Sequence, residues 1–238
     1  GVLATVKHLA ANNQEWDRNF VSSDMDERTL QEIYLPAFRE AVINGKAGAV
    51  MSAYNLLNGN YCSHNKHLLM EILKQEWRFD GFVMSDWGAV HDGVKAAQAG
   101  LDLEMPFGTF MNSNNLLPAL SSGLIQQSDI DDKVRRILRI LFQFRFFDRS
   151  QLDTSIPLDD PASAAIALDI ARSGIVLLKN DDQVLPLRME ELDTIAVIGP
   201  NGNKYLAGGG SSWTDPFHYT SVLEAIHTLA GNDITVTF

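Results

Sequence analysis

The sequence has few of the residues that redox, metal and nucleic-acid chemistry need. Cys62 is its only cysteine, so an internal disulfide is impossible and thiol redox or structural zinc chemistry is not expected. Basic residues are scarce too, because 19 Lys and Arg stand against 30 Asp and Glu, a formal net charge of −11. This balance argues against nucleic acid or an anionic membrane as the main partner and favours a neutral substrate. No apolar run approaches the roughly 18 residues that cross a bilayer.

Motifs for phosphate, metal and serine-nucleophile chemistry are also missing. The glycines at 199 and 202 follow an apolar run, but their spacing fits neither a dinucleotide-binding motif nor a P-loop. His64 and His67 lack a third ligand and the glutamate of a metalloprotease, and we interpret them as loop residues. No Gly-x-Ser-x-Gly motif occurs. We expect no metal and no organic cofactor, and the sequence leaves the compartment and the oligomeric state open.

Apolar runs recur near residues 2, 48, 82 and 101, with amphipathic segments in most of the gaps. This spacing is typical of βα units around a parallel sheet. We predict strands at 2–6, 48–53, 81–85 and 101–105. Polar or aromatic residues follow each run, as at the top face of a (β/α)8 barrel. A closed barrel takes about 250 residues, so a stretch this short predicts only part of one.

The residues that follow these runs form a candidate site. Asp86 directly follows the run at 81–85, and ligands of α/β folds bind outside the carboxyl ends of the strands. An equally consistent interpretation is that Asp86 caps the next helix. The other residues at such positions are Lys7, His8, Tyr54, Trp87 and Glu104, and Arg18 lies in the loop after the first run.

These residue types suit a sugar as ligand. Lysine, neutral histidine and arginine donate hydrogen bonds to hydroxyl groups, while indole and phenol rings pack against the apolar face of a pyranose. Each residue alone also has a structural explanation: His8 as a hydrogen-bonded core imidazole, Trp16 and Trp87 as packing residues. Gathered on one rim, they favour a carbohydrate site.

Helices are expected at 25–42, 66–77 and 91–99, with Pro36 bending or splitting the first. Ser128 and Asp131 have the spacing of a capping box at the start of a further helix. We interpret the arginines of that helix as a solvated face; they are Arg135, Arg136, Arg139 and Arg145. After it we predict a linker at 148–161, then a helix at 162–172, strands at 174–178 and 194–198, and a helix at 220–230.

Five segments resemble, in order and spacing, the β-glucosidases of glycoside hydrolase family 3. They are KHLAANNQE at 7–15, DERTL at 26–30, IYLPAF at 33–38, VMSAYN at 50–55 and GFVMSDW at 81–87. Two more, SGIVLLKN at 173–180 and IAVIGP at 195–200, are similar to the start of the second domain of that family, an α/β sandwich. The resemblance implies an α/β protein: the C-terminal part of a (β/α)8 TIM-like barrel over 1–147, then the linker, then the start of the sandwich over 162–238.

The resemblance also implies roles for single residues. Asp86 would be the nucleophile of a retaining exo-acting β-glucosidase, and an aspartate beside a lysine and an arginine is expected to stay ionised. Lys7, His8 and Arg18 would bind hydroxyl groups of the terminal glucosyl residue. Met51, Tyr54 and Trp87 would shape that subsite, and Ser211 or Ser212 would reach in from the second domain. The expected partner is a β-glucoside or a short β-linked oligosaccharide.

Two parts of the family pattern are not found. The early barrel would precede Gly1, and the acid/base glutamate would follow Phe238, so we expect little turnover from these residues alone. The loop at 12–15 lacks the His-Asp pair of the N-acetylglucosaminidase branch, which favours the glucosidase branch. The remaining alternatives are another specificity of the family, such as β-xylosidase, and a non-catalytic carbohydrate-binding protein.

Overall fold

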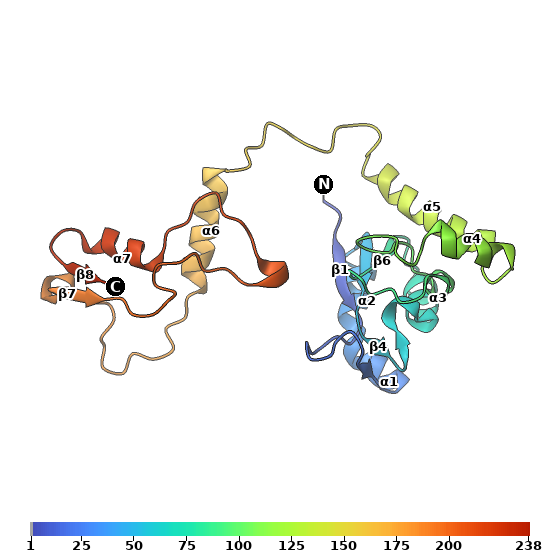
Figure 1. The fold of residues 1–238 in the computed structure, drawn as a ribbon, viewed down its shortest axis with the longest axis horizontal. Helices are drawn as coiled ribbons and strands as arrows, with labels where there is room; N and C mark the ends of the chain where they lie inside the picture. The colour runs from blue at the N-terminus through green and yellow to red at the C-terminus, as the bar shows by residue number, and fades with distance from the viewer. Residues whose placement is uncertain (1) are drawn as a thin grey trace. The chain divides into compact units, whose positions relative to one another are not determined.

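The computed structural model describes residues 2–238 as two compact units, one ending at Leu152 and the other beginning at Asp153. Figure 1 shows the sheet and helices of the first unit in blue to yellow-green and the elements of the second in orange and red. Secondary structure is mixed α/β in both units. No helix of the described residues is long and apolar enough to cross a membrane.

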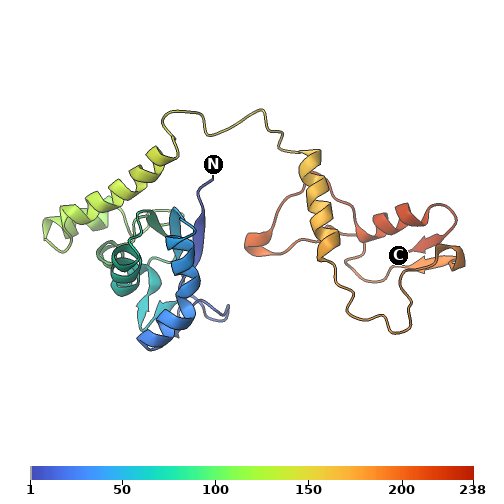
Figure 2. The same cartoon turned by 180° about the vertical axis from the view of Figure 1, so that it is seen from behind.

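The first unit is built on a parallel sheet of β1 (Thr5–Leu9), β3 (Ala49–Ser52) and β6 (Phe82–Ser85), in that order. Figure 2 shows this sheet from behind. The parallel pairing agrees with the expected βα units. The predicted bounds of the first strand are wrong, however, because Val2 is 94% exposed and pairing with β3 begins only at Thr5.

The predicted strand at 101–105 is also wrong as an element, since it makes a single bridge, from Leu103 to Met84. At this position a side chain accepts a backbone N–H of β6 that a neighbouring strand would otherwise bind. The Asp102 carboxylate accepts the Val83 N–H at 2.8 Å, and the N–H groups of Asp102 and Leu103 both donate to the Val83 carbonyl. The segment therefore lies beside β6 but does not continue the regular sheet.

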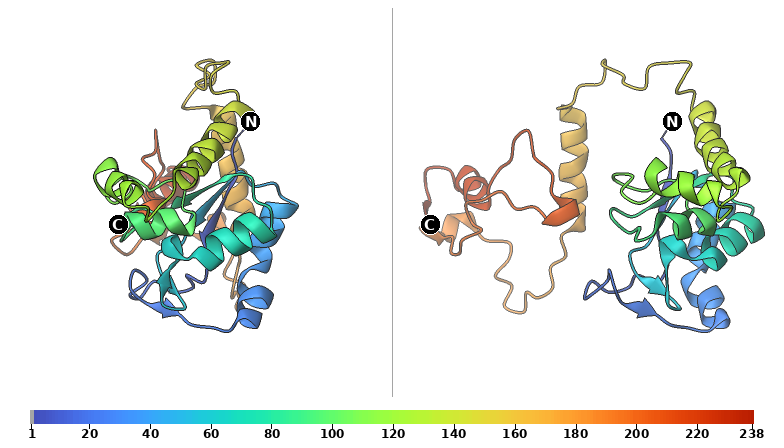
Figure 3. Two further views of the ribbon diagram at one scale, coloured as in Figure 1. Left: turned by 90° about the vertical axis from the view of Figure 1, so that its right-hand side faces the viewer. Right: turned by 45° about the vertical axis from the view of Figure 1, so that its right-hand side comes forward.

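Helices surround the sheet and enclose the core. Pro36 splits the predicted first helix, as expected, because proline has no backbone N–H to donate within a helix. In Figure 3, α2 and α5 flank the sheet, and α2 contacts β1 while α5 contacts β6. The helices are α1 (Glu27–Thr29), the π-helix η1 (Leu30–Tyr34), α2 (Pro36–Ile43), the π-helix η3 (His67–Glu76), α3 (Gly93–Ala99), α4 (Ser113–Ser121) and α5 (Gln127–Gln143).

A small second sheet of the first unit is formed by segments that follow β1 and β3 in the chain. It consists of β2 (Ser22–Ser23), β4 (Leu56–Leu57) and β5 (Asn60–Tyr61), followed by the 3-10 turn η2 (Cys62–His64). Asn58 and Gly59, both with positive φ, turn β4 into β5. Asn-Gly is the pair that such a hairpin prefers.

The start and the polar face of α5 differ from expectation. The capping box joins Gln126 and Asp129, two residues before the predicted pair of Ser128 and Asp131. Arg136 does not lie on a solvated face. Its side chain is only 12% exposed, and its guanidinium donates to the carbonyls of Phe79 and Gly81. It thereby ties α5 to the chain that leads into β6.

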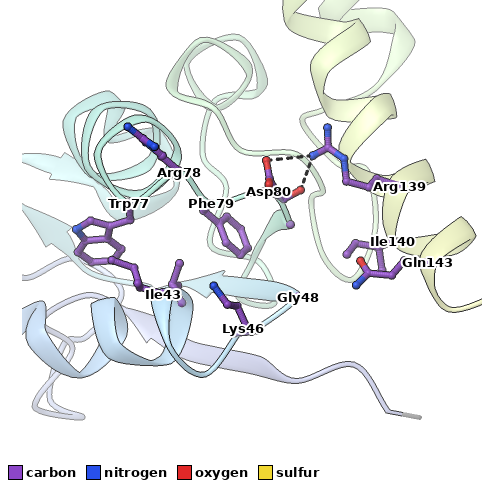
Figure 4. Close-up of a pocket in the computed structure, with 13 residues that line it drawn as sticks. Ile43, Lys46, Gly48, Trp77, Arg78, Phe79, Asp80, Arg139, Ile140 and Gln143 are labelled. Carbon is purple, nitrogen blue, oxygen red and sulfur yellow. Dashed lines mark hydrogen bonds and ion pairs between the residues drawn. The ribbon is translucent and has the colours of Figure 1, made fainter.

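The amino ends of β3 and β6 border a cavity of about 380 Å3, shown in Figure 4. Trp77 and Phe79 lie on one side of it and Ile140 on the other. Arg139 reaches across to the carbonyl of Asp80 at 2.6 Å and to its carboxylate at 3.7 Å. Arg139 is thus a second arginine of α5 that binds the chain before β6 and does not merely face water. The cavity lies at the opposite end of β6 from Asp86.

The second unit contains a small parallel sheet and two longer helices. Its predicted strand at 174–178 is wrong, because α6 continues to Gly174 and Val176 and Leu178 beyond it are exposed. An apolar run forms a strand only with a pairing partner, and in this unit the two described strands pair with each other. The elements are α6 (Pro161–Gly174), the 3-10 turn η4 (Met189–Glu191), β7 (Thr194–Ala196), the 3-10 turn η5 (Gly210–Ser212), α7 (Val222–Ala230) and β8 (Thr235–Thr237).

A buried ion pair holds η3 against the edge of β6. Lys74 Nζ lies 2.7 Å from Asp102 Oδ1, and the two side chains are 2% and 0% exposed. Burial lowers the pKa of Lys74 and raises the pKa of Asp102, while their mutual attraction opposes both shifts. Lys74 also lies 3.6 Å from Asp132, whereas Lys74 is the one ion-pair partner of Asp102 among residues 2–238. Removal of Lys74 therefore leaves the Asp102 carboxylate buried with only the Val83 N–H as a hydrogen-bond donor.

We therefore expect Lys74→Met to lower the free energy of unfolding of the first unit by about 3 kcal/mol or more. Arg28→Met is the matched control, because Arg28 and Glu32 form an ion pair that is 81% and 62% exposed and should contribute about 0.5 kcal/mol or less. Urea unfolding of both variants measures the difference. Equal losses of unfolding free energy in the two variants would contradict the expectation that the buried pair contributes more to stability than the exposed pair.

Candidate active site

Asp86 stands at the carboxyl end of β6, where the strand passes into a tight turn. Its N–H donates to the Ser52 carbonyl at the end of β3, which fixes the two strand ends together. Its side chain is 12% exposed, and Oδ1 accepts the Trp87 N–H at 2.7 Å. The next helix, α3, is capped by Asp92, which accepts from the N–H groups of Val94 and Lys95. The alternative that Asp86 caps this helix is therefore wrong.

His8 faces Asp86 from the carboxyl end of β1. Its Nε2 lies 3.2 Å from Asp86 Oδ2. Burial lowers the pKa of His8, with Lys7 and Arg18 adding to the effect and the Asp86 carboxylate opposing it. A neutral imidazole at pH 7 follows, so the ring must carry its proton on Nε2 to donate to the carboxylate. The alternative of a fully enclosed core histidine does not hold, since the side chain is 34% exposed.

Tyr54 and Arg18 complete this group of polar side chains. Burial, and then the Asp86 carboxylate, raise the pKa of Tyr54, so its hydroxyl keeps its proton and can donate. The Arg18 guanidinium lies 4.6 Å from the centre of the Tyr54 ring, a cation–π distance. Arg18 also pairs with the exposed Glu15 at 2.8 Å. Two possible hydrogen-bond donors, His8 and Tyr54, thus lie beside the Asp86 carboxylate, and Arg18 packs on one of them.

Lys7 and Met51 occupy neighbouring positions of the sheet. Met51 is the register partner of Lys7 on one side and of Met84 on the other. Lys7 is exposed and, with His8, lines a cavity of about 420 Å3. The Asn12 side chain lines the same cavity, and its Oδ1 is buried without a hydrogen-bond partner. A donor supplied by a ligand would satisfy that oxygen.

The remaining predicted residues are less closely connected with Asp86. Trp87 is next to it in the chain and its indole is 62% exposed, so it is not a packing residue. Trp16 is likewise exposed, at 86%. Ser211 and Ser212 lie in η5 of the second unit, and Ser212 Oγ donates to the Gly209 carbonyl. The structure brings together Lys7, His8, Arg18, Met51, Tyr54, Asp86 and Trp87 within the first unit.

Sequence reasoning missed the residues that support this group. Asn55 is fully buried and donates to the carbonyls of Ala10 and Leu56, which holds the turn after β1 against β4. Its only sequence signal is an amide directly after a strand. Glu104 behaves as expected, because its carboxylate accepts the N–H groups of Phe110 and Met111 and so binds locally. No group of three His, Cys, Asp or Glu residues suited to a metal occurs among residues 2–238.

The proximity of His8 and Asp86 predicts a titration result. Because the Asp86 carboxylate raises the pKa of His8, Asp86→Asn should lower that pKa further. An NMR titration of the imidazole Cε1–H signals measures it. His67, whose pKa is raised by Glu71 and Glu27, is the internal control and should not change. A His8 pKa that rises or stays constant in the variant would contradict this arrangement.

The sequence is similar to that of a known family of proteins. Residues 1–140 match the glycosyl hydrolase family 3 N terminal domain, and residues 175–236 match the glycosyl hydrolase family 3 C-terminal domain. A beta-glucosidase of Rhizobium radiobacter is 45% identical over 98% of this chain and 28% of its own length. The thermostable beta-glucosidase B of Acetivibrio thermocellus is 41% identical over the whole chain and 31% of its own length.

Solved structures lead to the same family. A GH3 beta-glucosidase of Bifidobacterium adolescentis has a TM-score of 0.82 and 35% identity, covering 100% of this chain and 34% of its own. A beta-glucosidase of Kluyveromyces marxianus in complex with glucose has a TM-score of 0.85 and 36% identity, covering 99% and 29%. The chain thus spans about a third or less of the length of these relatives. On the match of its first 140 residues, the chain belongs to glycosyl hydrolase family 3.

Proposed function

We propose that the chain carries the nucleophile and much of the glucosyl-binding site of a retaining, exo-acting β-glucosidase. The observation that carries the proposal is Asp86, placed at the carboxyl end of β6 with His8 and Tyr54 beside it and Arg18 on the Tyr54 ring. Relatives at 45% and 41% identity are named beta-glucosidases, and one similar structure has glucose bound. These names support the same reaction and the same terminal β-D-glucosyl substrate for this chain.

The proposal includes an architecture. Residues 1–147 form part of a (β/α)8 barrel, 148–161 a linker, and 162–238 the opening of an α/β sandwich. The three parallel strands with flanking helices support the barrel part, since a barrel repeats that unit eight times. The candidate residues lie at the carboxyl ends of the strands, as the active sites of barrel enzymes do.

The chemistry follows from the environment of the carboxylate. Asp86 attacks the anomeric carbon, its oxygen forms a glycosyl ester, and the bond to the leaving oxygen breaks as that oxygen takes a proton from a general acid. Water then cleaves the ester and releases glucose with retention. Among the described acids near the strand ends, Glu104 binds backbone N–H groups and Glu15 pairs with Arg18. On the family resemblance, we place the acid/base glutamate after Phe238.

The remaining candidates act in binding. Lys7, His8 and Arg18 hold hydroxyl groups of the glucosyl residue, and neutral His8 and protonated Tyr54 do so without adding charge beside the nucleophile. Met51 and Trp87 shape the subsite, and the exposed indole suits the apolar face of the sugar. Ser211 and Ser212 are included on the family resemblance alone. No cofactor takes part.

Replacement of the nucleophile tests the proposal directly. In the full-length protein, Asp86→Asn should lower kcat for a nitrophenyl β-glucoside by about 1,000-fold or more, since the variant cannot form the covalent intermediate. Asp80→Asn is the matched control at the other end of β6, where the side chain is 89% exposed, and it should retain activity. A 2-deoxy-2-fluoroglucoside should label the peptide with Asp86, and label on another side chain would refute the assignment.

Substrate choice gives a second test of the same proposal. Against a panel of nitrophenyl glycosides, the protein should show its highest kcat/KM with the β-glucoside. A higher value with the β-xyloside would transfer the assignment to a xylosidase of the same family. Binding of glucosides without turnover of any member of the panel would indicate a carbohydrate-binding protein.

A further inference from the structure

The segment from Trp87 to Asp92 joins the candidate nucleophile to α3 and is held by backbone hydrogen bonds. The Gly88 N–H donates to the Met105 carbonyl, and the Ala89 N–H donates to the carbonyl of Asp86 itself. Gly88 has a φ of +78°, which favours glycine at this turn. The position of the Asp86 carboxylate therefore depends on how the far end of this segment is fixed.

A histidine from another loop fixes that end. His64 Nε2 lies 3.2 Å from the His91 backbone nitrogen and 3.3 Å from the Asp92 backbone nitrogen. A backbone N–H can only donate, so His64 Nε2 must be unprotonated and accept both bonds. His64 is therefore present as the neutral tautomer with its proton on Nδ1. These two N–H groups immediately precede α3 and have no helical partner of their own.

His64 itself is attached to the end of β3. The preceding residue, Ser63, is buried, and its hydroxyl lies 2.8 Å from the Ser52 hydroxyl. The Ser52 carbonyl accepts the Asp86 N–H. Tyr61 stacks on the His91 ring at 3.9 Å and meets the His64 ring edge-on at 5.6 Å. Residues 61–64 thus contact both the end of β3 and the segment from Trp87 to Asp92 that leads into α3.

We propose that His64 is a positioning residue for the nucleophile, which it aligns by accepting the N–H groups of His91 and Asp92. The effect on catalysis rests on the proposed function, whereas the effect on the segment does not. Nothing in the reaction requires His64 to touch the sugar. Its contribution is to keep the turn after Asp86 in one conformation, which an active site needs for a defined attack geometry.

His64 can accept the two backbone N–H groups only while its ring is neutral, so we expect both hydrogen bonds to be lost in acid. Burial lowers the pKa of His64 to about 4, with His91 and Lys95 acting in the same direction and Asp92 opposing them. Tyr61 is the other titratable group that faces the ring. Because the folded-state pKa lies below the ordinary 6.5, the unfolded state binds more protons between these values. The stabilisation is complete above about pH 6.5 and is lost as the pH falls towards 4.

Hydrogen exchange tests the contact without any substrate. His64→Gln carries an amide oxygen that reaches about as far as Nε2, while the amide of His64→Asn is too short. At one neutral pD, the His91 and Asp92 amides should exchange about tenfold faster in His64→Asn and near the parent rate in His64→Gln. His67→Gln, a histidine paired only with Glu27 and Glu71, is the control. Equal rates in the Asn and Gln variants would overturn the proposal.

Kinetics of the full-length protein test the positioning role. His64→Asn should lower kcat several-fold while KM changes less, and His64→Gln should restore kcat. Because glutamine does not titrate, the ratio of kcat in His64→Gln to kcat in the parent should rise as the pH falls from 6 to 4. A constant ratio would overturn the proposal even if His64→Asn did not fold. A parent without glycosidase activity would refute the proposed function, while the exchange result would still decide the His64 contact.

Discussion

The structure of the first unit depends on the interactions that hold one short strand, β6, in place. β6 has only four residues, and its flanks are held by side chains as much as by the sheet. The buried Asp102 carboxylate binds Lys74 and the Val83 N–H together, and Arg136 holds the carbonyls of Phe79 and Gly81 at the amino end. Charged groups in a dry environment tolerate little displacement without losing their partners. The strand therefore delivers Asp86 to a fixed place.

The two ends of β6 differ in kind. The amino end is held by arginines of α5, whose guanidinium groups donate to backbone carbonyls. At the carboxyl end, three side chains carry no charge at neutral pH, His8, Tyr54 and His64, since burial shifts each away from its ionised form. Asp86 is presented at the end that carries these groups, in line with active sites that form at carboxyl ends of strands.

The parts that could be predicted from the sequence are those that local signals specify. Apolar runs bounded by glycine identified β3 and β6, and the rule that parallel strands end at one edge gathered Lys7, His8, Tyr54 and Asp86. The apolar run at 174–178 gave an equally clear signal but forms no strand, because pairing is a property of distant residues. The tie from Arg136 to the Gly81 carbonyl spans 55 positions and has no sequence signal beyond an arginine on a helix.

The two histidines of the carboxyl end show why residue type alone could not assign the site. His8 Nε2 faces a carboxylate and must donate, whereas His64 Nε2 faces two backbone N–H groups and must accept. The sequence placed His8 among sugar-binding residues and His64 in an ordinary loop, since only the atoms opposite each ring distinguish the roles. Protonation affects them in opposite ways: it strengthens the attraction of His8 to Asp86 and breaks both bonds of His64. Acid therefore tightens one contact of the nucleophile while it releases the turn that carries it.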